Sequence, residues 1–419
     1  KIGVCGFGTV GRSFVDHFLK YKQKISQNCN SQLALSLIAD RSIESKKFED
    51  NEIVFSSNVL DVIESDCDLI IELIGGTEIS KEIVIGSMNK GKSVITANKA
   101  LLALHGDELF KIANKNNVYL GFEASVAGAI PVIKTLVDSL SNEKISSITG
   151  ILNGTCNYIL DQMHTSNKSF SDSLVSAQKL GYAESDPSFD VGGNDAAHKI
   201  SILAILAFKI KSPFNEMFID GIESIELMDI YYADELGYKI KHIASSKSVD
   251  EQIECNSYPA LIPNSHILSN IDGVMNAVLI KGDRFGTSML YGHGAGGDAT
   301  ASAVVSNIKD FCNFKTGQVN SHSIYDLKSR NRITSIGELI SQYYLRIFAK
   351  DVPGVMAEIT STLASHNISI EAVTQHEPVE ENELIPIVII TNSVEFKSIE
   401  SAISQISRLE NIHEKIQLI

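Results

Sequence analysis

The densest group of reactive side chains lies in the middle of the chain. Four carboxylates fall within twelve consecutive residues: Glu184, Asp186, Asp190 and Asp195. Lys199 follows Asp195 by four residues, about one turn of a helix, which places both side chains on one face. A loop this acidic could bind a cationic amino group, although composition alone also fits a solvated loop. Burial lowers the pKa of an ammonium group beside such a carboxylate. Lys199 is therefore a candidate to hold or donate a proton at a carbonyl oxygen, with a purely structural ion pair as the alternative.

The segment that follows must position these groups. Residues 196–208 are apolar nearly all round, which predicts a buried helix. We expect Asn194 or Asp195 to cap this helix. His198 points to another face than Lys199, and we interpret it as a packing or surface histidine.

The first third of the chain has the pattern of a dinucleotide-binding fold. A short strand at residues 2–5 is followed by Gly6, Phe7, Gly8, Thr9, Val10 and Gly11, and we expect a helix over 12–20. Gly6 would make the turn, Gly8 would let the backbone approach the pyrophosphate, and Gly11 would allow close helix–strand packing. The helix N-terminus offers free N–H groups to phosphates. We predict an NAD(P) site here; the alternative is a glycine turn without a ligand.

The same region predicts a doubly wound parallel sheet. Further strands are expected at 33–39, 69–73, 93–96 and 118–122. Ligands of such sheets lie beyond the carboxyl ends of the strands, where Gly75, Thr96 and Lys99 follow two of the ends. Asp40 closes the second strand and favours NAD, whereas Arg41 could meet the 2′-phosphate of NADP. We interpret residues 20–32 as a polar insertion that delays this strand.

Two further glycine-rich stretches frame the acidic segment. Gly150–Tyr158 ends a strand and opens a helix, and its Asn153 and Thr155 could donate to a substrate carboxylate. Residues 292–297 precede another helix, with Gly296 near its start. This second glycine-rich helix start suggests another close approach of backbone to ligand.

The last eighty residues form a separate pattern. After a polar linker at 317–341, we expect strand 344–349, a helix to residue 366, strands near 370 and at 385–391, and a helix at 398–409. The predicted order is βαββαβ, a ferredoxin-like unit.

Composition excludes several classes of protein. The net charge of −15 argues against nucleic acid as the main partner, since phosphate binding needs a basic face. No apolar run reaches the length of a membrane span, and no targeting segment is apparent. Six scattered cysteines, without zinc-ligand spacing, fit reduced thiols. We therefore expect a cytoplasmic protein without membrane or nucleic-acid partners.

Taken together, these motifs resemble the homoserine dehydrogenase family. The match runs through nearly the whole chain, and its most specific part is Gly181–Lys199. The resemblance implies reversible NAD(P)-dependent reduction of L-aspartate 4-semialdehyde to L-homoserine by hydride transfer. It implies Lys199 as proton donor, Asp195 as its partner and Lys99 near the reacting carbon. Ser185 departs from the family's usual proline, which puts the rigidity of the loop in doubt.

The resemblance also implies roles for residues outside this cluster. Substrate would be bound by Glu184, Asp190, Lys99, Asn153, Thr155 and Gly181. A monovalent cation, usually sodium, would be bound by Glu123 with Val126, Gly128 and Ile130. Two alternatives remain: a dehydrogenase of another small amino-acid aldehyde, and a cofactor-binding sensor without catalysis.

The C-terminal DxPG turn and the Asn367–Ile370 strand resemble ACT domains, which bind effector amino acids at paired interfaces. A homodimer or homotetramer with amino-acid feedback is implied, and an ACT fold kept only for assembly is the alternative. We predict a dinucleotide-binding domain at 1–132 (completed by about 296–316), a substrate-binding and dimerisation domain at 133–295, the linker at 317–341 and an ACT domain at 342–419.

Overall fold

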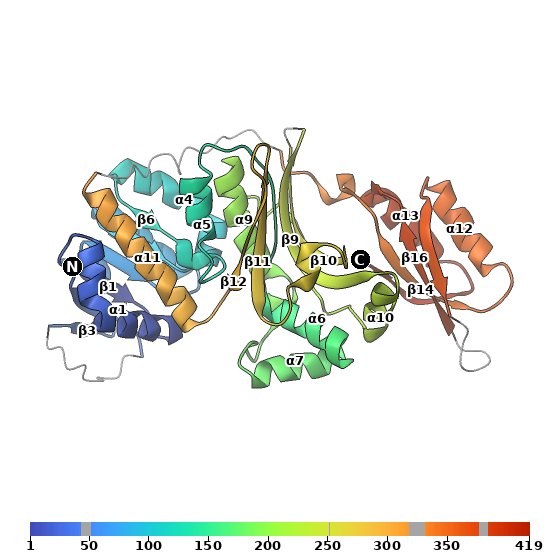
Figure 1. Cartoon of the computed structure of the whole chain (residues 1–419), viewed down its shortest axis with the longest axis horizontal. Coiled ribbons are helices and arrows are strands. Elements are labelled where there is room, and N and C mark those ends of the chain that lie inside the picture. The colour runs from blue at the N-terminus through green and yellow to red at the C-terminus, as the bar shows by residue number, and fades with distance from the viewer. Residues whose placement is uncertain (43–51, 251, 318–331, 377–383) are drawn as a thin grey trace.

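Three large sheets of different topology follow one another along the chain (Figure 1). The structure is a computed structural model that describes residues 1–42, 52–250, 252–317, 332–376 and 384–419. No described helix is long and apolar enough to cross a membrane.

The first sheet is parallel throughout, with the order β3-β2-β1-β4-β5-β6. Its strands are β1 (Ile2–Cys5), β2 (Leu35–Ala39), β3 (Val54–Ser56), β4 (Leu69–Glu72), β5 (Ser93–Thr96) and β6 (Leu120–Gly121), and its helices are α1 (Thr9–Asn28), α2 (Asp61–Glu64), α3 (Glu78–Asn89) and α4 (Lys99–Asn116). Helix α11 (Gly297–Lys315) comes from much later in the sequence and packs beside α1. The central strands are buried on both faces, which explains their continuous apolar runs. The predicted doubly wound fold is confirmed.

The polar insertion predicted at residues 20–32 is largely helix. Helix α1 continues to Asn28, with a local break at Tyr21 where φ is −114°. Ile25 and Cys29 are buried together with Phe14 and Phe18 in one hydrophobic cluster. These widely spaced apolar residues make a core-facing stripe, which keeps an otherwise polar sequence helical.

The second sheet is mixed, with the order β12-β11-β7-β9-β10-β8. Its strands are β7 (Ile145–Ile151), β8 (Phe218–Ile219), β9 (Tyr238–Val249), β10 (Gln252–Pro263), β11 (Met275–Gly282) and β12 (Gly286–His293). The helices of this part are α5 (Val132–Lys134), α6 (Gly154–Ser166), α7 (Phe170–Lys179), α8 (Ser188–Val191), α9 (Asn194–Phe208) and α10 (Leu227–Glu235), with the short 3₁₀ helices η1 (Glu123–Ser125) and η3 (Ile267–Asn270) and the π-helix η2 (Thr135–Ser139).

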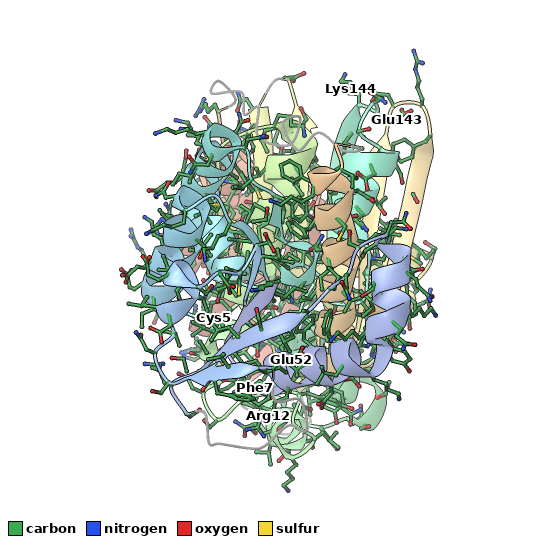
Figure 2. All side chains as sticks on the ribbon, turned by 90° about the vertical axis from the view of Figure 1, so that its left-hand side faces the viewer. Cys5, Phe7, Arg12, Glu52, Glu143 and Lys144 are labelled. Atoms are coloured by element: carbon green, nitrogen blue, oxygen red, sulfur yellow. The ribbon has the colours of Figure 1, made fainter. Side chains whose placement is uncertain are left out.

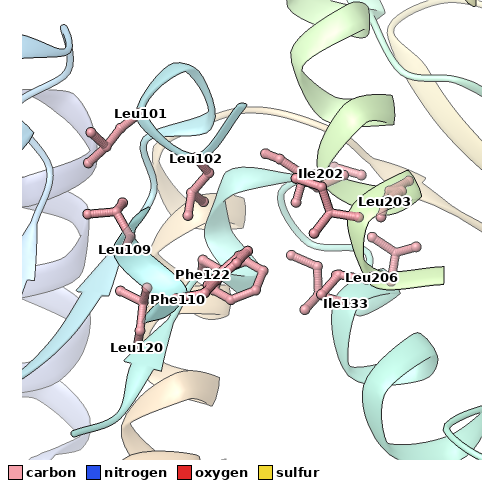
Figure 3. Packing of buried hydrophobic residues seen from close by; sticks show 14 of the residues in the cluster. Leu101, Leu102, Leu109, Phe110, Leu120, Phe122, Ile133, Ile202, Leu203 and Leu206 are labelled. Carbon is pink, nitrogen blue, oxygen red and sulfur yellow. The ribbon is translucent and has the colours of Figure 1, made fainter. Parts of the chain in front are cut away.

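Helix α9 is the buried helix that the sequence predicts. It packs on β9 and β10 and also against α4. Figure 3 shows Ile202, Leu203 and Leu206 of α9 on one side of a cluster that includes Leu102 and Phe110 of α4. One continuous hydrophobic core therefore joins the first two sheets.

The predicted cap of α9 is wrong. Gly193 occupies the N-cap position with φ of 84°, and no side chain caps the helix. A Cβ atom at position 193 would lie 2.6 Å from the carbonyl oxygen of Asp220, so only glycine fits there. The side chain of Asp195 turns instead toward two lysines.

The third sheet is antiparallel, with the order β15-β16-β14-β18. Its elements are β14 (Tyr344–Lys350), α12 (Val355–Ser365), β15 (Ile370–Gln375), β16 (Leu384–Thr391), α13 (Phe396–Ile406) and β18 (Ile412–Leu418), with β13 (Ile340–Ser341), β17 (Val394–Glu395) and η5 (Ile336–Glu338) beside them. The βαββαβ order is confirmed, although α13 starts and ends slightly earlier than predicted. Of the predicted linker, residues 318–331 lie outside the described residues.

The two faces of this third sheet have different partners. Leu345 and Ile347 of β14 face the core beneath α12 and α13. Tyr344 lies on the other face and clusters with Val388 and with Tyr232 of α10. Alternation along β14 thus gives the sheet one face for its own helices and one for the middle of the molecule.

Candidate active site

The glycine loop after β1 has the close contacts expected of a pyrophosphate cradle. Gly6 has φ of 100°, and a Cβ atom there would lie 2.6 Å from the backbone of Leu73. A Cβ atom on Gly11 would lie 2.1 Å from the carbonyl oxygen of Gly6, whereas Gly8 faces open space. Thr9 and Val10 open α1, so its free N–H groups lie at the loop. These features fit a bound dinucleotide.

The side chains around this loop define its edge. Figure 2 shows Phe7 and Arg12 close together below Cys5, and Arg12 Nε donates to the carbonyl oxygen of Phe7 at 3.2 Å. Asp40 accepts the N–H of Phe7 at 2.7 Å and that of Ser42 at 2.8 Å. Burial would raise the pKa of Asp40, but these bonds and the charge of Arg41 hold it below its usual range. The carboxylate therefore stays charged at the carboxyl end of β2, where a ribose would lie.

Glu72, at the end of β4, organises the next loop of this edge. It is fully buried and accepts the N–H of Ile74 at 2.9 Å and the hydroxyl groups of Ser80 at 3.0 Å and Thr96 at 2.6 Å. Gly75 follows with φ of 80° and open space where a side chain would be. The predicted cofactor residue Thr96 thus directs its hydroxyl group to Glu72, while Gly75 is exposed at the surface.

Lys99 and Lys199 meet at Asp195. Asn98 caps α4 and so holds Lys99 at the first helical position. The Nζ atom of Lys99 lies 2.5 Å from Asp195 Oδ1, and that of Lys199 lies 2.8 Å from Asp195 Oδ2. Asn153 Nδ2 donates to Oδ2 at 2.8 Å. The structure therefore joins three predicted residues from α4, α6 and α9 around one buried carboxylate.

The two lysines differ in exposure and in the direction in which their pKa values are shifted. Burial would raise the pKa of Asp195, but the two lysines outweigh it and hold the pKa below its usual range. Burial lowers the pKa of Lys199 despite the opposing charge of Asp195. Burial would also lower the pKa of Lys99, but Asp195 raises it overall. The side chain of Lys99 is 33% exposed and that of Lys199 8%. Lys199 is the buried group that gives up a proton more easily, and Lys99 is the more persistent cation.

Two further carboxylates surround the cluster. Asp190 Oδ1 accepts from Asn153 Nδ2 at 2.8 Å, and burial, together with the nearby charge of Asp195, raises the pKa of Asp190. Glu184 is exposed, and its charge is close enough to help raise the pKa of Lys99. Thr155 donates its hydroxyl to the carbonyl oxygen of Tyr182 at 2.7 Å, within the predicted acidic loop.

Gly181 begins that loop with φ of 75°. The ring of His198 is buried 4.3 Å from that of Phe214, and burial lowers its pKa to about 4. His198 is thus a neutral packing residue.

Asn276 on β11 belongs to the cluster but was not predicted. Its Nδ2 donates at 2.9 Å to the carbonyl oxygen of Leu152, which also accepts from Lys199 Nζ at 2.7 Å. A Cβ atom on Gly294 would lie 2.0 Å from the Asn276 amide. The carbonyl oxygen of Leu152 is thus the anchor of Lys199, and Asn276 connects this anchor to the second glycine-rich loop. An asparagine within an alternating strand gives no signal of such a role.

The second glycine-rich loop approaches the first. A Cβ atom on Gly297 would lie 2.6 Å from Ser13 Oγ and 3.3 Å from Thr9 Cγ2, both on α1. Gly296 has φ of 114° and open space around it. The two loops therefore lie side by side at the start of α1.

Glu123, the predicted cation ligand, is buried with its carboxylate already bonded. It accepts the N–H groups of Ile133 at 3.1 Å and Lys134 at 2.9 Å. Burial raises the pKa of Glu123 to about 7, although these bonds oppose the shift. Across the described ranges no group of three or more His, Cys, Asp or Glu is placed to hold a metal ion.

The backbone after Glu123 fits a monovalent cation better than its side chain does. Ala127 and Gly128 both have left-handed conformations, with φ of 54° and 46°. Among the described residues, no backbone N–H donates to the carbonyl oxygens of Val126 or Gly128, whereas that of Ile130 accepts from Val132 at 2.8 Å. Free carbonyl oxygens in a tight turn are suitable ligands for a hard cation.

Comparison with known proteins covers the whole chain. The NAD-binding domain model of homoserine dehydrogenase matches residues 6–123, the homoserine dehydrogenase model matches 131–308, and the ACT domain model matches 343–411. A homoserine dehydrogenase of Pseudomonas aeruginosa is 39% identical over 418 residues, which cover 98% of this chain and 96% of that protein.

Solved structures agree with this match. The crystal structure of a homoserine dehydrogenase from Thiobacillus denitrificans has a TM-score of 0.94 at 37% identity, covering 100% of this chain and 97% of that one. A hyperthermophilic archaeal homoserine dehydrogenase mutant in complex with NADPH has a TM-score of 0.64 at 26% identity, covering 76% of this chain and 98% of that one.

Proposed function

The chain belongs to the homoserine dehydrogenase family, and we propose that the Asp195 cluster is where it interconverts L-aspartate 4-semialdehyde and L-homoserine. It is an NAD(P)-dependent oxidoreductase, and the bound dinucleotide accepts or supplies the hydride at its nicotinamide ring. The observation that carries the proposal is the sharing of one buried carboxylate by Lys99 and Lys199.

The residues of the cluster divide the remaining work. Lys199 holds the proton that passes to the aldehyde oxygen during reduction, since burial favours its release. Lys99 keeps its charge and stabilises the developing alkoxide. Asp195 orients both ammonium groups, and Asp190 with Glu184 binds the substrate amino group.

The test is homoserine oxidation by the purified protein, followed at the nicotinamide absorbance with NAD and NADP in parallel. We expect turnover that is lost in Lys199→Ala, with cofactor binding near normal. Loss of cofactor binding in the same variant would mean that Lys199 is structural. No turnover of the unmodified protein, with sodium or potassium present, would favour another aldehyde substrate or the sensor alternative.

We propose Asp40 as the residue that binds the ribose hydroxyls, which favours NAD, because its carboxylate stays charged beside the glycine loop. A 2′-phosphate next to this charge would be repelled unless Arg41 neutralised it. Asp40→Ala should shift the NAD-to-NADP ratio of kcat/KM toward NADP, and Arg41→Ala should shift it the other way.

We propose a monovalent cation, sodium first, at the turn formed by Glu123, Val126, Gly128 and Ile130. The free carbonyl oxygens of Val126 and Gly128 support this. Replacing sodium by the larger tetramethylammonium ion should lower the melting temperature if the turn binds a cation.

We propose a homodimer formed through the face of the second sheet opposite α9. Leu279 and Met289 are only partly buried on this face, and Tyr291 is 54% exposed. Light scattering of the purified protein tests the dimer, and Tyr291→Glu should yield monomers.

We further propose the domain limits 1–132 with 296–316, 133–295 and 342–419. We also propose feedback by an amino acid at the ACT domain and a cytoplasmic location.

A further inference from the structure

The ring of Phe189 lies against the ammonium group of Lys99. The Nζ atom of Lys99 is 5.6 Å from the centroid of this ring. At such a distance the face of an aromatic ring attracts a cation. The ammonium group of Lys99 therefore has two partners of different kinds, the carboxylate of Asp195 and an uncharged aromatic ring.

Phe189 belongs to α8, the short helix that also carries Asp190. The residue is 41% exposed, so the hydrophobic effect gives only part of the reason for a large apolar side chain at this position. Contact with a cation is an interaction that a phenyl ring can make and an aliphatic side chain cannot. The aromatic character of residue 189 is therefore the property to test.

Two further rings support Phe189. The ring centroid of His198, on α9, lies 5.3 Å from that of Phe189 and 4.3 Å from that of Phe214. These separations are typical of packed aromatic side chains. Burial, together with the charge of Lys99, lowers the pKa of His198 to about 4, so this ring is neutral and does not repel the lysine. The three rings form a row that ends at the ammonium group.

The row of rings is attached to the helix that carries Lys99. Ser212, two residues before Phe214, donates its hydroxyl group to the carbonyl oxygen of Ala103. Ala103 lies one turn after Lys99 on α4. Because the far end of the row is bonded to α4, the place of the Phe189 ring relative to Lys99 is set by packed elements and not by a free side chain.

Charged groups face Lys99 from the neighbouring elements. Three are carboxylates, which raise the pKa of Lys99, and one is a second ammonium group, which repels it. These groups are Asp195 and Lys199 of α9, Asp190 of α8 and Glu184 of the acidic loop. A lysine side chain is long and flexible, so the carboxylates compete for its ammonium group. A rigid, uncharged ring beside Asp195 favours one of these positions over the others.

We propose that Phe189 is a positioning residue, whose aromatic face holds the charged side chain of Lys99 beside Asp195. The proposal rests on the proposed function, in which Lys99 stabilises the developing alkoxide. Leucine at position 189 would keep most of the apolar volume but not the aromatic face. Lys99 would then hold its proton less firmly and turn more often toward the acidic loop, where it no longer meets the reacting oxygen.

The first test measures the proton affinity of Lys99 without turnover. The full-length protein is labelled with a trace of acetic anhydride at a pH well below the pKa of Lys99, where the rate of acetylation is proportional to the neutral fraction. Loss of the ring contact should lower this pKa, so mass spectrometry should find Lys99 acetylated about two- to fivefold faster in Phe189→Leu and unchanged in Phe189→Tyr. Lys81, whose side chain is 31% exposed and paired with Glu108, is the internal control.

The second test follows homoserine oxidation. Phe189→Leu should lower kcat about two- to fivefold with KM for the cofactor unchanged, while Phe189→Tyr and Phe189→Trp should keep kcat within about twofold. Tyr21→Leu is the matched control and should leave kcat unchanged. Tyr21 is 40% exposed on α1, outside the Asp195 cluster, and the Nζ atom of Lys20 lies 5.3 Å from its ring centroid.

A double-mutant cycle separates positioning of Lys99 from general packing. When Lys99→Met is already present, Phe189→Leu should cause no further fall in kcat. An equal fall with and without Lys99 would overturn the proposal, and so would an unchanged rate of Lys99 acetylation in Phe189→Leu. An equal rise of that rate in Phe189→Tyr would also overturn it, since access and not the ring would then explain the change. Failure of the proposed function would appear separately, as absent turnover of the unmodified protein.

Discussion

Two buried aspartates, Asp195 and Asp229, each pair with cationic side chains, but the two pairs have different surroundings and partners. Asp195, in the middle of the chain, is shared by two lysines, while Asp229 is held by Arg346 and Tyr344 from the ACT domain. Asp195 is 3% exposed and Asp229 fully buried, so both carboxylates are removed from water. The two carboxylates differ in the cation that each one pairs with. We infer that the lysines at Asp195 serve the reaction and that the arginine at Asp229 attaches the ACT domain.

A lysine can lose its proton, but an arginine cannot. Burial lowers the pKa of Lys199, which is the direction that the proposed proton transfer requires. Burial would also lower the pKa of Arg346, yet the two bonds from its guanidinium to Asp229 raise it. We infer that a buried carboxylate with lysines marks a reacting site here, and that one with a bidentate arginine marks a fixed joint.

The largest effect on kcat should come from replacing Lys199 by arginine, the cation found at Asp229. In Lys199→Arg the charge beside Asp195 is kept but the transferable proton is lost, so kcat should fall about 10²–10⁴-fold, as for loss of a general acid. The kcat of Lys199→Ala should fall by a similar factor. Single-turnover absorbance measurements would show it, with cofactor binding measured by calorimetry.

The control for Lys199 is another buried lysine. Lys241 is 2% exposed, and its Nζ donates to the carbonyl oxygen of Ile271 at 2.6 Å. Lys241→Ala should lower stability but leave kcat within a few-fold. If Lys199→Arg kept full activity, the lysine would serve only as a charge.

Substitution in the Asp229–Arg346 pair should lower the free energy of unfolding and not kcat. Asp229→Ala leaves the buried guanidinium of Arg346 with only the exposed carboxylate of Glu226, so the protein should be destabilised toward the lower end of about 3–5 kcal/mol. Urea unfolding measures this, while kcat at saturating substrate should change little. A large loss of kcat with unchanged stability would contradict the division between the two sites.

Weakening the substrate subsite should affect KM more than kcat. Asp190→Asn removes one anionic partner of the substrate amino group, and loss of a charge-assisted hydrogen bond costs about 1.5–3 kcal/mol. KM for homoserine should rise roughly tenfold or more, with KM for the cofactor unchanged. Asp186→Asn, an exposed carboxylate of the same loop, is the matched control and should leave KM for homoserine unchanged.

The elements around Asp195 could be predicted because their signals are local. The apolar run of α9 and the spacing of Asp195 and Lys199 lie within one helix. The Asp229–Arg346 pair has no local sequence pattern that predicts it, since the two residues are 117 positions apart and neither belongs to a motif. The same reasoning explains the wrong cap of α9, because tertiary partners of Asp195 decide where its side chain points.

The pH dependence follows from the direction of the shift at Lys199. During homoserine oxidation Lys199 must be neutral to accept a proton, so kcat should rise with pH and level off above its pKa. The midpoint should lie below the ordinary lysine value of 10.5. The charge of Asp190 raises the pKa of Lys199, so Asp190→Asn should move the midpoint lower still. An unmoved midpoint would mean that another group limits the rate.

The smallest effect should be at Asn276, which acts on Lys199 only through the carbonyl oxygen of Leu152. Asn276→Ala removes one neutral hydrogen bond of about 0.5–1.5 kcal/mol, so kcat should fall about two- to tenfold. Asn276→Asp instead adds a negative charge near the anchor of Lys199, which should raise its pKa and move the pH midpoint of oxidation upward. A merely structural asparagine would lower the melting temperature in both variants and leave the midpoint in place. A shift of the midpoint in the alanine variant, which adds no charge, would show that the native amide helps to set the proton affinity of Lys199.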